Sequence, residues 1–148
     1  YTKVYTDKGK AGAPTRVSDG KGFIKKYEGA AVDKVRVYLP VFPGTNCDYD
    51  TARAFKRAGA EVVISVFKNL TGADVLESIK EMTENIAQCH IMALSGGFSA
   101  GDEPDGSGKF IANVLNNKDV ADAIHALLDR GGLMLGICNG FQALVKSG

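Results

Sequence analysis

The sequence has no apolar run that approaches the ~20 residues a membrane-spanning helix needs. Tyr1 is not followed by the basic and apolar segments of a secretory signal peptide. These two absences predict a cytoplasmic protein that makes no contact with a membrane.

Cysteine is scarce, and its spacing matches no common framework. The three cysteines are Cys47, Cys89 and Cys138, an odd number without a CxxC pair. Disulfide-rich secreted domains and structural zinc sites need more cysteines or a closer spacing. We therefore expect reduced thiols in a reducing compartment and no metal site.

A strong excess of charge of one sign is also missing. The net charge is +1 over 148 residues, which is too balanced for a general nucleic-acid binder. Seven lysines and arginines precede Asp33, against three acids, but few aromatic residues lie among them. Glycines punctuate residues 1–33, and no hydrophobic period is visible. We expect 1–33 to be a linker or the end of a preceding domain, and 34–148 to be a separate domain.

From residue 34 onward, β-branched and apolar segments alternate with amphipathic segments. The former predict four strands, of which the first is buried: Val35–Phe42, Glu61–Phe67, His90–Gly97 and Leu133–Cys138. Helices are predicted between them, for example on the face formed by Val75, Ile79, Met82 and Ile86. The alternation predicts an α/β domain with a flavodoxin-like, doubly wound, mostly parallel sheet.

The first predicted helix has recognisable ends. Thr45 or Asn46 can cap its start, and Asp48 and Asp50 suit the positive end of its dipole. Gly59 is a typical residue just beyond a helix end.

Three polar or glycine-rich loops follow predicted strands. They are Pro43–Asp48, Ser95–Gly108 and Gly136–Gly140. Ligands of open α/β sheets bind outside the carboxyl ends of the strands, where these loops meet. The sequence therefore predicts a site at this edge of the sheet.

The third loop has the spacing G-x-C-x-G, from Gly136 to Gly140, which matches a nucleophile elbow with cysteine in place of serine. Small neighbours permit a sharp bend that presents Cys138 at a helix N-terminus, where the dipole favours the thiolate form. The Asn139 N–H would then face an oxyanion. The alternative is a buried cysteine at the end of a strand. Cys47 is a weaker candidate nucleophile, which we expect to line a pocket wall or to pack. We expect Cys89 to lie in a loop or at a strand start.

The segments PGTNCD, SGGFSAGDE and GICNGFQ, in this order, resemble the class I (triad) glutamine amidotransferases. Among these, they are most similar to the glutaminase domains of phosphoribosylformylglycinamidine synthases. The resemblance covers about Val35 to Gly148.

The resemblance implies that Cys138 attacks the side-chain amide of glutamine, forms a thioester and releases ammonia. The N–H groups of Gly97 or Phe98 and of Asn139 would form the oxyanion hole. Gln142 would hold the bound glutamine or the elbow, and Asn46 would contact the substrate.

The same resemblance implies a partner. Ammonia would pass to a synthetase domain or subunit, where ATP and magnesium activate formylglycinamide ribonucleotide during de novo purine biosynthesis. We expect no cofactor within these 148 residues.

One departure from the family pattern concerns the catalytic base. In the family, a histidine and a glutamate in an H-x-E motif lie well downstream of the nucleophile, whereas this sequence has only His90 and His125. We expect both to be structural or surface residues, and the chain to be a truncated glutaminase domain that is incomplete at its C-terminus and inactive alone. Two alternatives are a non-catalytic flavodoxin-like binding domain and a related cysteine-elbow hydrolase, although Asn139 disfavours the latter.

Overall fold

The structure is a computed structural model that describes residues 31–102 and 108–148. The predicted linker, residues 1–33, lies outside the described residues except for its last three positions. The predictions for residues 34–148 can therefore be compared with the structure, apart from the segment 103–107.

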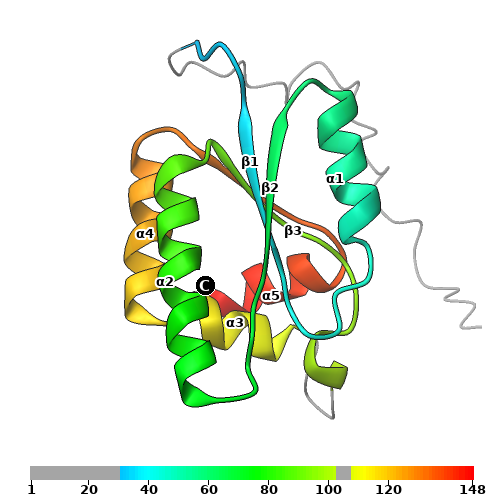
Figure 1. The fold of residues 1–148 in the computed structure, drawn as a ribbon, viewed down its shortest axis with the longest axis vertical. Helices are drawn as coiled ribbons and strands as arrows, with labels where there is room; N and C mark the ends of the chain where they lie inside the picture. Colours follow the sequence, from blue (N-terminus) through cyan, green and yellow to red (C-terminus); the bar gives the residue numbers. More distant parts are fainter. Residues whose placement is uncertain (1–30, 103–107) are drawn as a thin grey trace, which may run out of the picture. The chain divides into compact units, whose positions relative to one another are not determined.

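A sheet of four strands forms the centre of the domain (Figure 1). The strands are β1 (Arg36–Val41), β2 (Glu61–Val66), β3 (Ile91–Leu94) and β4 (Leu133–Gly136). Their order is β2-β1-β3-β4, and all neighbouring pairs are parallel. The predicted α/β fold with a parallel sheet is confirmed, and the carboxyl ends of all four strands meet at one edge.

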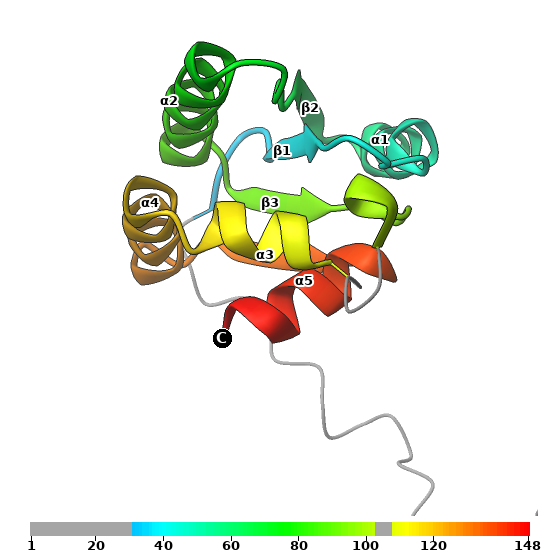
Figure 2. The same ribbon diagram turned by 90° about the horizontal axis from the view of Figure 1, so that it is seen from below.

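Helices cover both faces of this sheet. They are α1 (Asp48–Arg57), α2 (Gly72–Gln88), α3 (Lys109–Leu115), α4 (Lys118–Asp129) and α5 (Asn139–Ser147), with a short 3₁₀ turn, η1 (Ser99–Asp102). Helices α2 and α4 lie side by side on one face, and α1 lies on the other (Figures 1 and 2). Helices α3 and α5 pack against each other, and α5 also packs against β3 and β4.

The core lies between the sheet and α2 and α4. Its fully buried side chains include Tyr38, Met82, Ile86, Met92 and Leu127. The predicted helical face of α2 is confirmed at Met82 and Ile86, because both point into this core.

Three phenylalanines close the core near the carboxyl edge of the sheet. The ring centroids of Phe42 and Phe67, which follow β1 and β2, lie 5.5 Å apart. Phe110 of α3 meets them edge-on at 6.2 and 5.8 Å. Aromatic pairs favour such geometries, so this cluster packs tightly where β1 and β2 end.

The predicted cap of α1 is wrong. The residue that precedes α1 is Cys47, and it makes no side-chain cap hydrogen bond. The Thr45 Oγ1 atom instead accepts from the Phe42 N–H at 3.1 Å, which closes the turn after β1. The two predicted acidic residues do lie in the first turn of α1, and Gly59 follows the helix end with a φ of 89°.

Strand β4 lies at an edge of the sheet. Leu133 and Leu135, on one face of this strand, are 51% and 40% exposed. Within the part of the chain that the structure describes, no helix is long and apolar enough to cross a bilayer.

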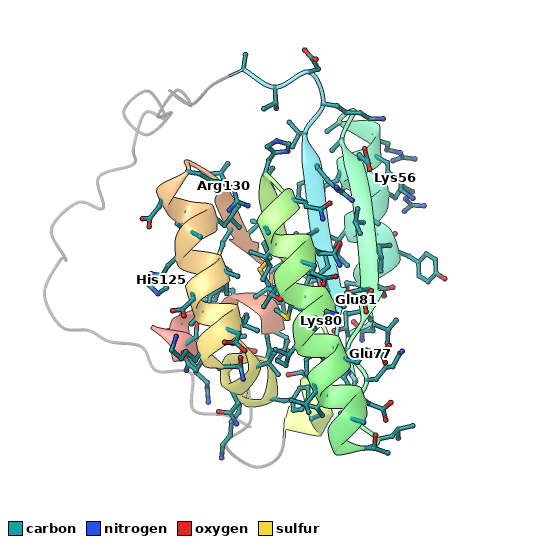
Figure 3. The ribbon with its side chains drawn as sticks, turned by 60° about the vertical axis from the view of Figure 1, so that its left-hand side comes forward. Lys56, Glu77, Lys80, Glu81, His125 and Arg130 are labelled. Atoms are coloured by element: carbon teal, nitrogen blue, oxygen red, sulfur yellow. The ribbon has the colours of Figure 1, made fainter. Side chains whose placement is uncertain are left out.

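Helix α2 has no basic residue in its last turn, and Arg130 provides the missing positive charge. Figure 3 shows Arg130 at the end of α4, beside the C-terminal end of α2. Its Nη2 atom donates to the carbonyl oxygens of Ile86 at 2.5 Å and Cys89 at 3.0 Å. The Ile86 carbonyl also accepts from the Cys89 N–H at 3.4 Å, and carbonyls at a helix end have few intrahelical donors. The two bonds from Arg130 therefore add to the cap of α2 and link it to α4.

We predict that Arg130→Met lowers the free energy of unfolding by about 1–3 kcal/mol, because two hydrogen bonds from a charged donor to helix-terminal carbonyls are lost. Urea denaturation measures this change. The control is Arg57→Met at the exposed end of α1, where we expect less than about 0.5 kcal/mol. Equal effects of the two substitutions would contradict the role assigned to Arg130.

Candidate active site

Cys138 lies at a sharp bend between β4 and α5. Its backbone has φ 51° and ψ −109°, and its side chain is exposed. Ala100 is the other non-glycine residue with a positive φ in the described part of the chain. Such a conformation costs about 1–3 kcal/mol and is kept only where surrounding contacts enforce it. The bend predicted from the glycine spacing is confirmed, and the thiol lies outside the apolar core.

The glycines on either side of Cys138 allow α5 to approach the sheet closely. A Cβ atom on Gly140 would lie 2.2 Å from the carbonyl oxygen of Leu94 at the end of β3. A Cβ atom on Gly136 would lie 2.8 Å from the carbonyl oxygen of Gly140. Since these atoms are backbone, they cannot move aside cheaply. The close approach holds the bend in place and keeps the first turn of α5 against β3.

Backbone hydrogen bonds join the loop after β1 to the loop after β3. The Phe98 N–H donates to Gly44 O at 2.9 Å, and the Asn46 N–H donates to Gly96 O at 3.2 Å. Two of the three predicted site loops therefore form one connected rim at the carboxyl edge of the sheet.

The side chain of Asn139 joins this rim to the bend. Asn139 is 2% exposed, although the neighbouring Cys138 is exposed. Its Oδ1 atom accepts from the Ser99 N–H at 3.2 Å, and its Nδ2 atom donates to Gln142 Oε1 at 3.4 Å. Sequence reasoning assigned a role only to the Asn139 N–H. The signal for the side chain was an asparagine directly after the elbow cysteine, three residues before Gln142 on the same helix.

The structure narrows the set of expected oxyanion donors. The Phe98 N–H is engaged with Gly44 O, so this expected donor is wrong. Gly97 has a φ of 146°, and no hydrogen bond among the described residues uses its N–H. Of the two expected donors in this loop, the Gly97 N–H is therefore the one that fits an oxyanion hole, and the role of the Asn139 N–H stays a prediction.

Cys47 lies close to Cys138. A Cβ atom on Gly96 would lie 3.4 Å from Cys138 Cβ and 3.6 Å from Cys47 Sγ. The absent side chain of Gly96 thus leaves a gap between the two exposed cysteines. This position agrees with the expected place of Cys47 beside the site, where its thiol donates to Asn46 Oδ1 at 3.1 Å.

The two predicted substrate contacts lie at the same edge of the sheet. Asn46 and Gln142 are both exposed. The side-chain oxygen of Gln142 accepts from the Asn139 side chain, as expected for a residue that holds the elbow. A direct contact of either residue with glutamine stays a prediction.

The remaining candidates lie away from the bend. His90 precedes β3 at the amino-terminal edge of the sheet, where its Nδ1 atom accepts from the Arg36 N–H at 2.9 Å. His125 is exposed on α4 (Figure 3). Cys89 is 2% exposed at the end of α2, and burial raises the pKa of its thiol. Neither histidine lies near Cys138.

Comparisons with known proteins show what this chain is similar to. A family model described as a CobB/CobQ-like glutamine amidotransferase domain matches residues 34–148. Similar curated proteins include the phosphoribosylformylglycinamidine synthase subunit PurQ of Dehalococcoides mccartyi, 38% identical over 79% of this chain and 42% of that protein. The same subunit of Methanococcus maripaludis is 41% identical over 71% of this chain and 35% of that protein.

A solved structure is also similar. It is titled as the structure of PurLQS from Thermotoga maritima, and the match has a TM-score of 0.55 and 30% sequence identity. It covers 78% of this chain and 45% of that chain. The chain therefore spans less than half the length of these relatives.

We predict that Gly140→Ala destabilises the domain by at least about 3 kcal/mol, as expected for overpacking against a rigid backbone oxygen. The matched control is Gly72→Ala at the start of α2, where a Cβ atom meets nothing within 4 Å. The control should stabilise the domain by about 0.5–1 kcal/mol. Thermal unfolding of both variants measures the difference, and similar melting temperatures would contradict the close approach of α5 to β3.

Proposed function

The chain belongs to the CobB/CobQ-like glutamine amidotransferase domain family, and from this membership we propose that its carboxyl-edge site takes the amide nitrogen from glutamine. The observation that carries the proposal is Cys138, an exposed thiol held at a positive φ in the bend between β4 and α5. A cysteine that serves only for packing has no need of this strained conformation, and exposure gives a substrate access to it.

In the proposed reaction, Cys138 Sγ attacks the side-chain amide carbon of glutamine. The carbonyl oxygen becomes an oxyanion, and the N–H groups of Gly97 and Asn139 donate to it. Such donors are worth about 3–4 kcal/mol of transition-state stabilisation each. The C–N bond then breaks, the amide nitrogen takes up the proton that the thiol lost and leaves as ammonia, and a thioester remains. Water hydrolyses the thioester to glutamate and restores the thiol.

The described histidines do not supply the base for these proton transfers, because neither lies near Cys138. The roles proposed for this chain are therefore nucleophile, oxyanion stabilisation and binding of glutamine. Asn46 and Gln142, both exposed at the rim, are the proposed contacts for the glutamine head group. A single covalent reaction at Cys138 can test these roles, because it does not require multiple turnovers.

We also propose the fate of the ammonia. The curated relatives are named as a subunit of phosphoribosylformylglycinamidine synthase, so the partner would be the synthetase of that enzyme. There, ATP and magnesium would activate formylglycinamide ribonucleotide, and ammonia would convert it to the amidine. This chain would supply the nitrogen and would hold neither ATP nor magnesium.

We predict that a chloroketone analogue of glutamine labels Cys138 at least tenfold faster than Cys47 or Cys89. The elbow exposes Cys138 where the glutamine part of the reagent is proposed to bind, whereas Cys89 is buried with a raised thiol pKa. Peptide mass spectrometry after timed labelling measures all three thiols in the same molecule. Cys138→Ser should remove the fast phase.

Protection supplies the control for this experiment. L-glutamine should slow the labelling of Cys138, and D-glutamine at the same concentration should not. Slow labelling of all three cysteines, without protection by L-glutamine, would reject the glutaminase and favour the non-catalytic binding domain.

A further inference from the structure

The Asn139 carboxamide is a buried polar group next to the proposed nucleophile. It is 2% exposed, and Ser99, which it contacts, is also 2% exposed. A buried amide is costly unless its polar atoms are hydrogen-bonded. Both ends of this carboxamide have partners, the Ser99 N–H on Oδ1 and Gln142 Oε1 on Nδ2.

The orientation of this carboxamide follows from its partners. A backbone N–H can only donate, so the Ser99 N–H requires the oxygen of Asn139. The Gln142 oxygen then faces the Asn139 nitrogen. The carboxamide therefore points its acceptor at the loop after β3 and its donor at α5.

The bond to Ser99 joins two segments that are 40 residues apart in sequence. Ser99 comes two residues after Gly97, which bears one proposed oxyanion donor. Asn139 bears the other donor on its own backbone. One side chain thus connects the two segments whose N–H groups must meet at one oxygen.

The segment after Ser99 is strained and depends on such contacts. Ala100 has a φ of 51°, and Gly101 has a φ of 82°. A non-glycine residue keeps a positive φ only where its surroundings enforce it. Here the bonds from the Ala100 N–H to Pro43 O and from the Ser99 N–H to Asn139 Oδ1 hold the turn.

We propose that the Asn139 carboxamide is a positioning residue that sets the separation of the two oxyanion donors by holding the loop after β3 against the elbow. This inference rests on the proposed function for the identity of the donors. Oxyanion donors must lie about 2.7–3.1 Å from the oxygen, and a productive site tolerates displacements of only about 0.5 Å. Loss of the bond to Ser99 lets the strained turn relax and moves Gly97 beyond this tolerance.

The test compares two reactions of the Cys138 thiol in the whole chain. With p-nitrophenyl acetate, sulfur attacks the ester carbonyl, an oxyanion forms, p-nitrophenolate leaves and an acetyl thioester remains. With iodoacetamide, sulfur attacks a methylene carbon and iodide leaves without an oxyanion. The ratio of the two rates at Cys138, read by peptide mass spectrometry, reports the oxyanion hole and cancels changes in thiolate fraction or exposure.

We expect Asn139→Ala to lower this ratio at least about tenfold. Asn139→Asp keeps an acceptor for the Ser99 N–H and should keep the ratio within about threefold of the unmodified chain. Asn85→Ala is the matched control, because Asn85 is a half-buried asparagine on α2 whose side chain donates only to the Glu81 carbonyl among the described residues. If the alanine variant does not fold, Asn139→Leu removes the acceptor while filling a similar volume.

Three results would overturn the proposal. In the first, a folded Asn139→Ala or Asn139→Leu variant keeps the ratio of the unmodified chain. In the second, Asn139→Asp lowers the rate ratio by as much as Asn139→Ala does. In the third, Cys138 of the unmodified chain shows no higher ratio than Cys47 in the same molecule.

Failure of the proposed function gives a different pattern, because neither reagent requires recognition of glutamine. If Asn139→Ala lowers the rate ratio as expected but L-glutamine does not protect Cys138, glutamine is rejected as the substrate and the positioning role is kept. Protection by glutamine with an unchanged ratio would reject the positioning role alone.

Discussion

The structure of the site depends on the approach of the first turn of α5 to the carbonyl end of β3. A Cβ atom on Gly140 would lie 2.2 Å from Leu94 O, so only glycine permits this approach. The approach leaves Cys138 at a positive φ with its thiol exposed. The backbone strain is confined to this bend. The stability of the packed parallel sheet maintains the strained conformation of Cys138.

Around this contact, backbone and side-chain hydrogen bonds combine three loops into one rim. The loops after β1 and β3 are joined through the Phe98 N–H and Gly44 O, and the loop after β3 is joined to the elbow through Ser99 and Asn139. Phe42 of the aromatic cluster comes directly before the loop after β1, so this loop leaves the sheet next to tightly packed apolar side chains. Rigid packing beside the loops suits a site that must hold donors at a fixed spacing.

The fold and the bend could be predicted because their causes are local. Alternating apolar segments indicate strands and helices of a parallel sheet, and two glycines flanking Cys138 indicate a tight bend. Contacts between distant segments could not be predicted this way. Thr45 closes a turn instead of capping α1, the Phe98 N–H is used by another loop, and the Asn139 side chain meets Ser99 only after the chain has folded.

The central claim is that the bend aims Cys138 at an oxygen held by two backbone donors. A crystal structure of the covalent adduct between Cys138 and a chloroketone analogue of glutamine tests it most directly. The account predicts that the adduct oxygen lies about 2.7–3.1 Å from the backbone nitrogens of both Gly97 and Asn139. An adduct oxygen that faces solvent, or a Cys138 relaxed to a negative φ, would contradict the account.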